Sequence, residues 1–429
     1  MLRTHFAKDI EPGTVKVAGW VHEKRALGGI LFVILRDSTG LMQIIAKKDK
    51  TDAQMIRTLE GLSRESVVSI EGKAVESKNA PNGVEVIPGI IEILAEAEPL
   101  PIDTSPGIKT GLDKRLDFRS VDLRKPENYA IFKVQSTLLQ EMQSFLKENS
   151  FMQIFTPCLM GVASESGSEV FSVVYFDREA FLRQDPQLHR QLAIAGGLER
   201  VYDVGPAWRA EHSHTVRHMC EHRVMAVETS FIENEYDVIR LENDLIINSM
   251  EKLQKDCKRE LKMFNAEMEI PKKIPILEFP EIYDILEELG EPLPRGEDLN
   301  GAAEKKLGEY VKEKHKSDFF FANKFPFKVK PFYVMRDGEW ARSVDLIFKG
   351  IEMSSGGQRE HRYDKIMEQA KLKGMNPESV KWFADFFKWG VPTHGGFALG
   401  IERLTMQILG LENVREATLF PRDTERLTP

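Results

Sequence analysis

Three charged side chains in two segments have the chemistry of an anion-binding site. Arg209 and Glu211 lie two residues apart, and Arg403 follows a glycine-rich run at 395–400. A guanidinium group is always charged and holds phosphate or carboxylate oxygens through paired hydrogen bonds. Glycine lets a backbone approach a ligand closely. The simplest alternative for Arg209 and Glu211 is a surface ion pair, because alternate residues of a strand share one face.

Two acids could hold a metal ion. Asp345 and Glu352 lie seven residues apart and flank Gly350. Carboxylates suit Mg²⁺, which usually takes one or two of them together with phosphates and water. The alternative is two solvated acids on a pair of strands.

A cluster of histidines is a weaker metal candidate. Four of the ten histidines fall within eleven residues, namely His212, His214, His218 and His222. No cysteine pair accompanies them and their spacing does not suit tetrahedral zinc. We therefore predict no zinc site here.

The composition is that of a folded protein in a reducing compartment. The 429 residues carry 59 basic and 67 acidic side chains, a net charge of −8, which argues against bulk attraction to nucleic acid. The sequence has no apolar run long enough to span a membrane and no secretory signal at its start. Three scattered cysteines indicate reduced thiols. We expect a cytoplasmic protein of two or three domains.

The N-terminal part reads as a small barrel. Five runs rich in Val, Ile and Phe, separated by turn signals, predict strands at 15–22, 30–37, 41–46, 66–74 and 84–94. The polar run 50–61 predicts one helix between the third and fourth strands. This is the pattern of an OB-fold barrel, whose open face binds single-stranded nucleic acid. A barrel that only packs against its neighbour fits the pattern equally well.

The rest of the chain reads as an α+β domain. Prolines near 99–106 predict a hinge or linker over 98–127, after domain 1–97. Residues 128–429 would form the second domain, which begins with a helix at 128–149 and carries an insertion at about 280–325. Strands separated by long insertions predict an antiparallel sheet flanked by helices.

Three segments of this domain resemble a known set of motifs. They are residues 151–157, residues 208–228 and the glycine-rich strand entering a helix at 395–403. In this order and behind an OB-like domain, they resemble motifs 1, 2 and 3 of the class II aminoacyl-tRNA synthetases. The resemblance implies ATP as a substrate, Mg²⁺, tRNA as a partner and a homodimer built on motif 1.

The resemblance also assigns roles to residues near ATP. Arg209, Glu211 and Arg403 would be the catalytic residues, with Arg209 bridging the amino-acid carboxylate and the α-phosphate. The implied ATP-binding set is Arg209, Ala210, Glu211, Arg217, His218, Met219, Glu352, Gly400, Ile401, Glu402 and Arg403. The implied metal site is Asp345 and Glu352, with Ser355 nearby.

Residues 354–360, Ser-Ser-Gly-Gly-Gln-Arg-Glu, are similar to the aspartyl and asparaginyl branch of class II. The whole chain, including its Leu-Phe-Pro-Arg-Asp ending at 419–423, resembles the archaeal-type aspartyl-tRNA synthetases. The residues implied at the aspartate are Glu165, Gln187, Leu188, His189, Arg190, Arg209, Ser355 and Arg359. An arginine fork is the expected selector for a side-chain carboxylate.

In that family the barrel reads the anticodon. Phe32 would stack on a splayed base, while Gln43 and Glu85 would read hydrogen-bonding edges. Core packing is the alternative for Phe32. His22 and Pro81 resemble the residues of non-discriminating members, which also charge asparagine tRNA.

The amino-acid pocket departs from the family pattern at four positions. The usual Gln-Ser-Pro-Gln-Leu-Tyr-Lys has become residues 184–190, with Asp185 for serine, His189 for tyrosine and Arg190 for lysine. Ala226 stands where an aspartate usually meets the substrate amino group, and Asp185 could replace that carboxylate. An altered or relaxed acidic substrate is therefore a further hypothesis.

Other functions remain open. They are an asparaginyl-type synthetase or paralogue, a non-catalytic RNA-binding protein that kept the fold, and a tRNA-independent asparagine synthetase. The N-terminal barrel disfavours the last of these.

Overall fold

The computed structural model describes residues 1–105, 107–161, 169–210 and 215–429. They form two compact units, Met1–Asp103 and Thr104–Pro429. In the described ranges, no helix has the length and apolar character needed to cross a membrane.

The first unit is a closed barrel with strand order β1-β2-β3-β5-β4, as the sequence predicted. Its strands are β1 (Gly13–Leu27), β2 (Ile30–Asp37), β3 (Gly40–Lys47), β4 (Val67–Glu76) and β5 (Val84–Ala95). Alternate residues of β2, such as Leu31 and Val33, are buried in the barrel core. The predicted helix is α1 (Ala53–Gly61), which begins where the Asp52 carboxylate accepts the N–H groups of Gln54 and Met55.

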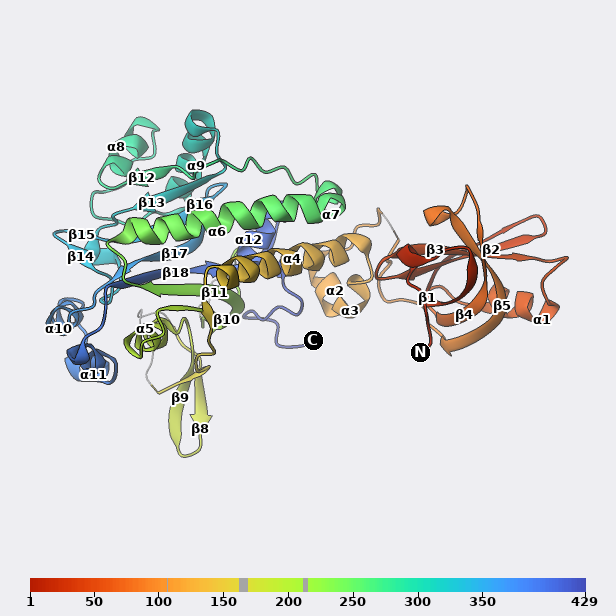
Figure 1. The fold of residues 1–429 in the computed structure, drawn as a ribbon, viewed down its shortest axis with the longest axis horizontal. Helices are drawn as coiled ribbons and strands as arrows, with labels where there is room; N and C mark the ends of the chain where they lie inside the picture. The colour runs from red at the N-terminus through yellow and green to blue at the C-terminus, as the bar shows by residue number, and fades with distance from the viewer. Residues whose placement is uncertain (106, 162–168, 211–214) are drawn as a thin grey trace. The chain divides into compact units, whose positions relative to one another are not determined.

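The second unit is built on an eight-stranded sheet with the order β12-β13-β16-β17-β18-β11-β10-β6 (Figure 1). In that order the strands are Ile276–Glu278, Phe319–Asn323, Ser343–Phe348, Ile351–Arg359, His394–Gly400, Glu221–Ser230, Arg200–Trp208 and Met152–Gln153. The inner pairs are antiparallel, as predicted, but both edge strands, β6 and β12, pair in parallel with their neighbours. The sheet is therefore mixed.

Helices cover both faces of this sheet. The long helices α4 (Pro126–Glu148) and α6 (Glu235–Asp256), with α12 (Ile401–Leu409), pack on one face around the main hydrophobic core (Figure 1). On the other face lie α5 (Gln187–Ala195), α8 (Glu281–Glu288) and α9 (Gly301–His315). Strand β13 contributes apolar side chains to both faces of the sheet. Phe319 and Phe321 join the core under α6, and Phe320 joins the one under α8 and α9.

The remaining elements are short. The helices are α2 (Leu112–Asp117), α3 (Arg119–Asp122), α7 (Lys258–Met263), α10 (Tyr363–Leu372) and α11 (Pro377–Ala384), and two strands, β14 (Arg336–Asp337) and β15 (Trp340–Ala341), form a hairpin. Helices α2 and α3 fall within the predicted linker 98–127, and both belong to the second unit. The predicted insertion 280–325 holds α8 and α9, but it also contains the sheet strand β13.

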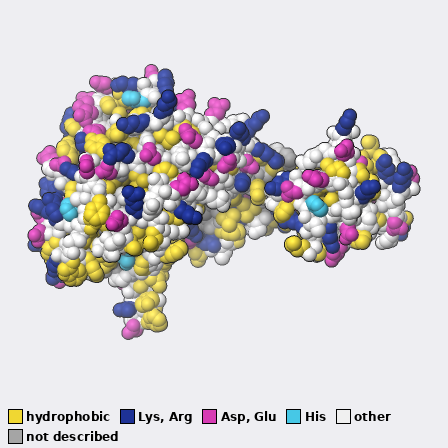
Figure 2. Space-filling model, in the orientation of Figure 1, with side chains coloured by type: hydrophobic (Ala, Val, Ile, Leu, Met, Phe, Trp, Pro, Cys, Tyr) yellow, Lys and Arg dark blue, Asp and Glu magenta, His cyan; other side chains and the backbone are white. Residues whose placement is uncertain are grey.

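A separate three-stranded sheet projects from the second unit. It consists of β7 (Leu159–Met160), β8 (Ser172–Tyr175) and β9 (Arg178–Leu182). Hydrophobic side chains gather on its projecting hairpin (Figure 2), where Val174 and Phe176 are 90% and 84% exposed.

Candidate active site

A cavity of about 770 Å³ opens on the sheet face opposite α6. Its floor comes from β11, β17 and β18, because alternate residues of these strands point away from the core. On β18, Phe397 and Leu399 enter the core, whereas Ala398 and Gly400 line the cavity.

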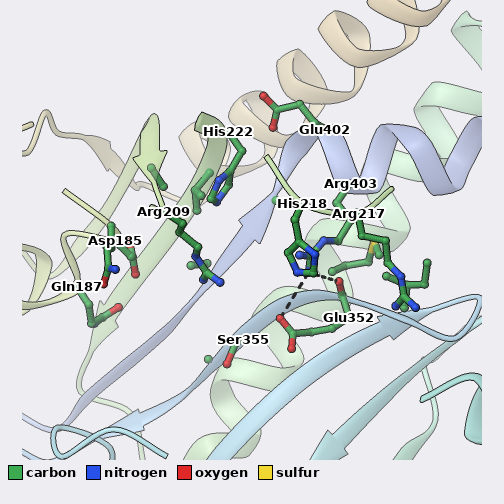
Figure 3. Close-up of a pocket in the computed structure, with 18 of the residues that line it drawn as sticks. Asp185, Gln187, Arg209, Arg217, His218, His222, Glu352, Ser355, Glu402 and Arg403 are labelled. Carbon is green, nitrogen blue, oxygen red and sulfur yellow. Dashed lines mark hydrogen bonds and ion pairs between the residues drawn. The ribbon is translucent and has the colours of Figure 1, made fainter. Parts of the chain in front are cut away.

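Residues far apart in the chain meet in this cavity. Arg209 follows β10, Glu352 lies on β17 and Arg403 lies in the first turn of α12, and all three line it. Arg403 Nη1 donates to the Glu352 carbonyl oxygen at 3.0 Å and lies 3.8 Å from its carboxylate. Arg209 lies between Asp185 and Gln187 on one side and Arg403 on the other (Figure 3).

One end of the cavity, the Gln187 end, is a hydrogen-bonded cluster of Asp185, Gln187, Arg190, Glu228 and Arg359. Arg359 Nε donates to Glu228 Oε1 at 3.0 Å, and its Nη2 donates to Gln187 Oε1 at 3.1 Å. Arg190 donates to both Asp185 oxygens at 2.7 and 2.8 Å, and to Gln187 Oε1 at 2.7 Å. Gln187 Nε2 donates to Glu228 Oε2 at 3.0 Å. Each of these charges is paired, as burial requires.

The other end, the Arg403 end, contains Arg217, Glu304, Glu352 and Arg403. Glu304, from α9, accepts the backbone N–H of Glu352 at 3.2 Å. Burial, with the nearby Glu352, raises the pKa of Glu304 to about 7. Burial and Asp345 also raise the pKa of Glu352. This end therefore holds acids whose ionisation is unfavourable.

A histidine faces the middle of the cavity. His222, on β11, has its pKa lowered to about 3 by burial and by the positive charges of Arg209 and Arg403. The ring is therefore neutral at physiological pH, and it adds no positive charge beside the two arginines.

The two predicted metal ligands have different surroundings. Glu352 lines the cavity, whereas Asp345 is 5% exposed and its Oδ2 accepts from Lys330 Nζ at 2.8 Å. Asp345 Oδ1 is buried without a hydrogen-bond partner among the described residues. Ser355, paired with Asp345 across β16 and β17, is exposed to the cavity. Within the described ranges, no three His, Cys, Asp or Glu side chains form a ready metal cluster.

Most of the predicted residues line the cavity. They are Gln187, Arg209, Arg217, His218, Met219, Glu352, Ser355, Arg359, Gly400, Glu402 and Arg403. The Glu402 carboxylate is fixed by the backbone of β11, because both of its oxygens accept the N–H of Arg223.

Other predicted residues lie outside the lining. Leu188 and Ile401 are buried in hydrophobic cores, and the His189 ring lies 5.3 Å from that of Trp382. Ala210, Asp345 and Arg190 are not among the residues that line the cavity, and Ala226 is 2% exposed. Glu165 and Glu211, like His212 and His214, lie outside the described residues.

Sequence reasoning missed several lining residues. Glu304 and Gly301 belong to α9 in the insertion, and Lys330 lies in a loop. A side chain at Gly301 would meet the guanidinium of Arg217, because a Cβ there would lie 3.2 Å from Nη2. No motif signals these contacts, since they depend on how the insertion folds back over the sheet.

The predicted anticodon residues lie on the barrel. Gln43 Nε2 donates to Glu85 Oε2 at 3.2 Å, across the parallel pairing of β3 and β5. Phe32 is half-buried on the face of β2 opposite the buried Leu31 and Val33. Two further candidates complete this set: His22 Nδ1 lies 3.3 Å from Arg36 Nη1, and Pro81 begins a 3₁₀ turn before β5.

Two family models match the chain. Residues 111–424 match tRNA synthetases class II (D, K and N), and residues 15–94 match the OB-fold nucleic acid binding domain of the anticodon-binding type. The chain belongs to the class II tRNA synthetases. The family membership predicted from the three motifs is thereby confirmed. Synthetases of this class use ATP, generally with Mg²⁺, to activate an amino acid.

Curated relatives are similar to this synthetase over its full length. Two are the aspartate–tRNA(Asp/Asn) ligase of Methanopyrus kandleri and the aspartate–tRNA(Asp) ligase of Thermococcus kodakarensis. Each is 42% identical, with all of both chains covered.

Solved structures share the fold of the synthetase. The asparaginyl-tRNA synthetase of Pyrococcus horikoshii with asparaginyl-adenylate has a TM-score of 0.94 at 31% identity, with both chains fully covered. The aspartyl-tRNA synthetase of Entamoeba histolytica has a TM-score of 0.87 at 30% identity, covering 97% of this chain and 90% of that one.

Proposed function

We propose that this synthetase activates L-aspartate with ATP to aspartyl-adenylate and transfers the aspartyl group to tRNA(Asp). The observation that carries the proposal is the meeting of Arg209, Glu352 and Arg403 in one cavity. The relatives at 42% identity are named aspartate–tRNA ligases, which favours aspartate over asparagine.

The order of charged groups along the cavity fits this reaction. Attack of a carboxylate on the α-phosphate brings two anions together, and fixed positive charges offset their repulsion. Arg209, in the middle, would bridge the two reacting groups. Arg403, Arg217 and His218, from the Arg403 end, would hold the nucleotide. No enzyme nucleophile is needed, because orientation and electrostatics supply the acceleration.

The Arg403 end suits Mg²⁺. Glu352 offers a cavity-facing carboxylate, and the unpartnered Asp345 Oδ1 offers a second oxygen. These two acids, with Ser355 nearby, would hold the ion, which when bound would offset the charge of the phosphates. A cation would also relieve the unfavourable ionisation of Glu352.

The Gln187 end suits a side-chain carboxylate. Arg359 uses Nε and Nη2 on Glu228, Gln187 and the Gly396 carbonyl oxygen. No described residue accepts from its Nη1, which leaves one side of the fork for a ligand. We therefore take Arg359 as the selector for aspartate.

The barrel would read the anticodon through Phe32, Gln43 and Glu85. The anticodons for aspartate and asparagine differ at one base, and His22 and Pro81 resemble non-discriminating members. We propose that tRNA(Asn) is a second acceptor, in line with the Asp/Asn names of some relatives.

A homodimer built on the first motif is part of the proposal. Met152 on β6 and Phe155 just after it are 55% and 85% exposed at the edge of the large sheet. Exposed apolar side chains at a sheet edge favour association with another surface. A second copy of this chain would bury them.

ATP–pyrophosphate exchange with a panel of amino acids tests the function, followed by charging of transcripts of both tRNAs. We expect exchange with L-aspartate and charging of both transcripts. Exchange with asparagine alone would favour an asparaginyl-type enzyme, and no exchange would favour an RNA-binding protein. Asparagine synthesis without tRNA would indicate an asparagine synthetase. Charging of tRNA(Asp) alone would refute only the relaxed acceptor.

A further inference from the structure

The two side chains of the Asp185–Arg190 ion pair, at the Gln187 end, differ in their exposure. The Arg190 side chain is 1% exposed, whereas that of Asp185 is 37% exposed and lines the cavity. Burial opposes ionisation of Asp185, but Arg190, together with Arg359 and Arg183, holds its pKa below the ordinary value. The cavity therefore meets an ionised carboxylate fixed from behind.

We propose that Asp185 binds the α-ammonium group of the amino-acid substrate and that Arg190 is a positioning residue for it. Each Asp185 oxygen accepts one hydrogen bond from Arg190. A carboxylate accepts about four in all, so capacity remains on the cavity side. This inference rests on the proposed function, since it names the group that orients the substrate for attack.

The other described acids that line the cavity are less suited to an ammonium group beside Arg359. Glu304 and Glu352 belong to the Arg403 end, and Glu352 lies across Arg209 from Asp185 (Figure 3). Both oxygens of Glu402 accept the Arg223 backbone N–H. Asp185 is the acid that shares a hydrogen-bonded cluster with Arg359.

Without the Asp185 charge, a substrate ammonium would be repelled at this end. The cluster contains the cations Arg190 and Arg359 and the anions Asp185 and Glu228, and Glu228 is 0% exposed. With Asp185 ionised, the surface that faces the cavity is negative at Asp185 and positive at Arg359. Such a surface matches an α-amino acid with an acidic side chain.

Arg190 does not line the cavity, so its unused N–H groups are not presented to a substrate. Its Nη atoms donate to Asp185 and Gln187, and its Nε is buried without a partner among the described residues. The Gln187 oxygen accepts from both Arg190 and Arg359. Arg190 therefore fixes Asp185 and Gln187 together, and recognition of the acidic side chain falls to Arg359.

The test compares L-aspartate with succinate, which is aspartate without its amino group. In the full-length enzyme, Asp185→Asn keeps the shape but removes the charge. We expect the KM for aspartate in ATP–pyrophosphate exchange to rise about 10- to 100-fold, because a charge-assisted hydrogen bond is lost. The KM for ATP should change less than about threefold. The inhibition constant of succinate should stay constant or fall.

The controls separate binding from folding. Asp284, on α8, forms an exposed ion pair with Arg295. Asp284→Asn therefore removes a comparable carboxylate away from the cavity, and it should leave the KM for aspartate, the KM for ATP and the inhibition constant of succinate unchanged. Equal losses for aspartate and succinate would mean that Asp185 only shapes the pocket, which overturns the proposal. An unchanged KM for aspartate would also overturn it. If the wild-type enzyme does not activate aspartate, the proposed function fails instead.

Arg190→Lys provides the second variant. Lysine keeps the charge but cannot bind both Asp185 oxygens through a planar fork. We expect a smaller rise in the KM for aspartate than in Asp185→Asn, and no further rise when the two changes are combined. Additive losses would show that Arg190 acts independently of Asp185 and would refute its positioning role.

Discussion

The two ends of the cavity manage charge in opposite ways. At the Gln187 end, two arginines, two acids and one amide are joined by hydrogen bonds of 2.7 to 3.4 Å, so each charge has a partner. At the Arg403 end, two acids with raised pKa values lie close together, and Arg403 contacts the Glu352 backbone more closely than its carboxylate.

The difference follows from what each end would bind. A small amino acid offers few atoms, so selectivity depends on groups that are already fixed in place. A triphosphate with its metal ion brings large charges of both signs, so the protein can leave its own charges partly uncompensated until binding. The Gln187 end is therefore built for selection and the Arg403 end for charge neutralisation.

The largest effect is expected from Arg359→Lys at the Gln187 end. Lysine cannot hold the buried Glu228, Gln187 and a substrate carboxylate at once, because it lacks the planar fork. We expect kcat/KM for aspartate to fall at least about 100-fold, which corresponds to about 3 kcal/mol. The KM for ATP should stay within about threefold. Steady-state exchange kinetics with each substrate varied in turn measure both.

Arg362→Lys is the matched control for Arg359→Lys. Arg362 also pairs with a glutamate, Glu360, but its side chain is 54% exposed and it lies outside the cavity lining. We expect its kinetics to match those of the wild-type enzyme. A similar loss in both variants, or a loss shared equally by aspartate and ATP, would contradict the division between the two ends.

An intermediate effect is expected from Arg403→Lys at the Arg403 end. The change keeps the charge but removes the fork that reaches both the Glu352 backbone and the cavity. We expect the KM for ATP to rise about 10- to 30-fold, with a smaller change for aspartate. Arg240→Lys, on the exposed side of α6, serves as the control, since its side chain is 71% exposed. A loss confined to aspartate would reverse the proposed assignment of the ends.

The two ends were not equally predictable from sequence. Arg209, Arg359 and Arg403 were found because their motifs survive in the linear pattern. The Asp185–Arg190 pair was visible as two departures from a family pattern, but only the fold shows that the two side chains bind each other. The fold itself was mostly predictable, because its strands alternate and turn signals separate them.

Contacts supplied by the insertion were not predictable. Glu304 has the sequence surroundings of an ordinary acid on an amphipathic helix. Its burial arises because α9 folds back onto β17, where the carboxylate accepts the Glu352 N–H. A strand was predicted within 151–157, where β6 lies, but the parallel pairing of β6 and β12 was not, because strands of two or three residues are too short to show periodicity.

The smallest effect is expected from Glu304→Gln, and it appears in stability. The folded state raises the pKa of Glu304 from 4.5 to about 7. Between those pH values the unfolded chain has released this proton and the folded chain keeps it. The wild-type protein therefore loses stability as pH rises, by at most about 3 kcal/mol in total. Glutamine can still accept the Glu352 N–H and does not titrate.

The free energy of unfolding is measured for both proteins from pH 4.5 to 8, and groups that do not interact with Glu304 cancel in the difference. The stability advantage of Glu304→Gln should start near zero, grow between about pH 4.5 and 7 and then level off. Glu309→Gln, on the exposed side of the same helix, is the matched control for the loss of a carboxylate from α9. A flat difference for Glu304→Gln would show that this acid ionises without cost. In that case the Arg403 end would be as well compensated as the Gln187 end, and the contrast between them would disappear.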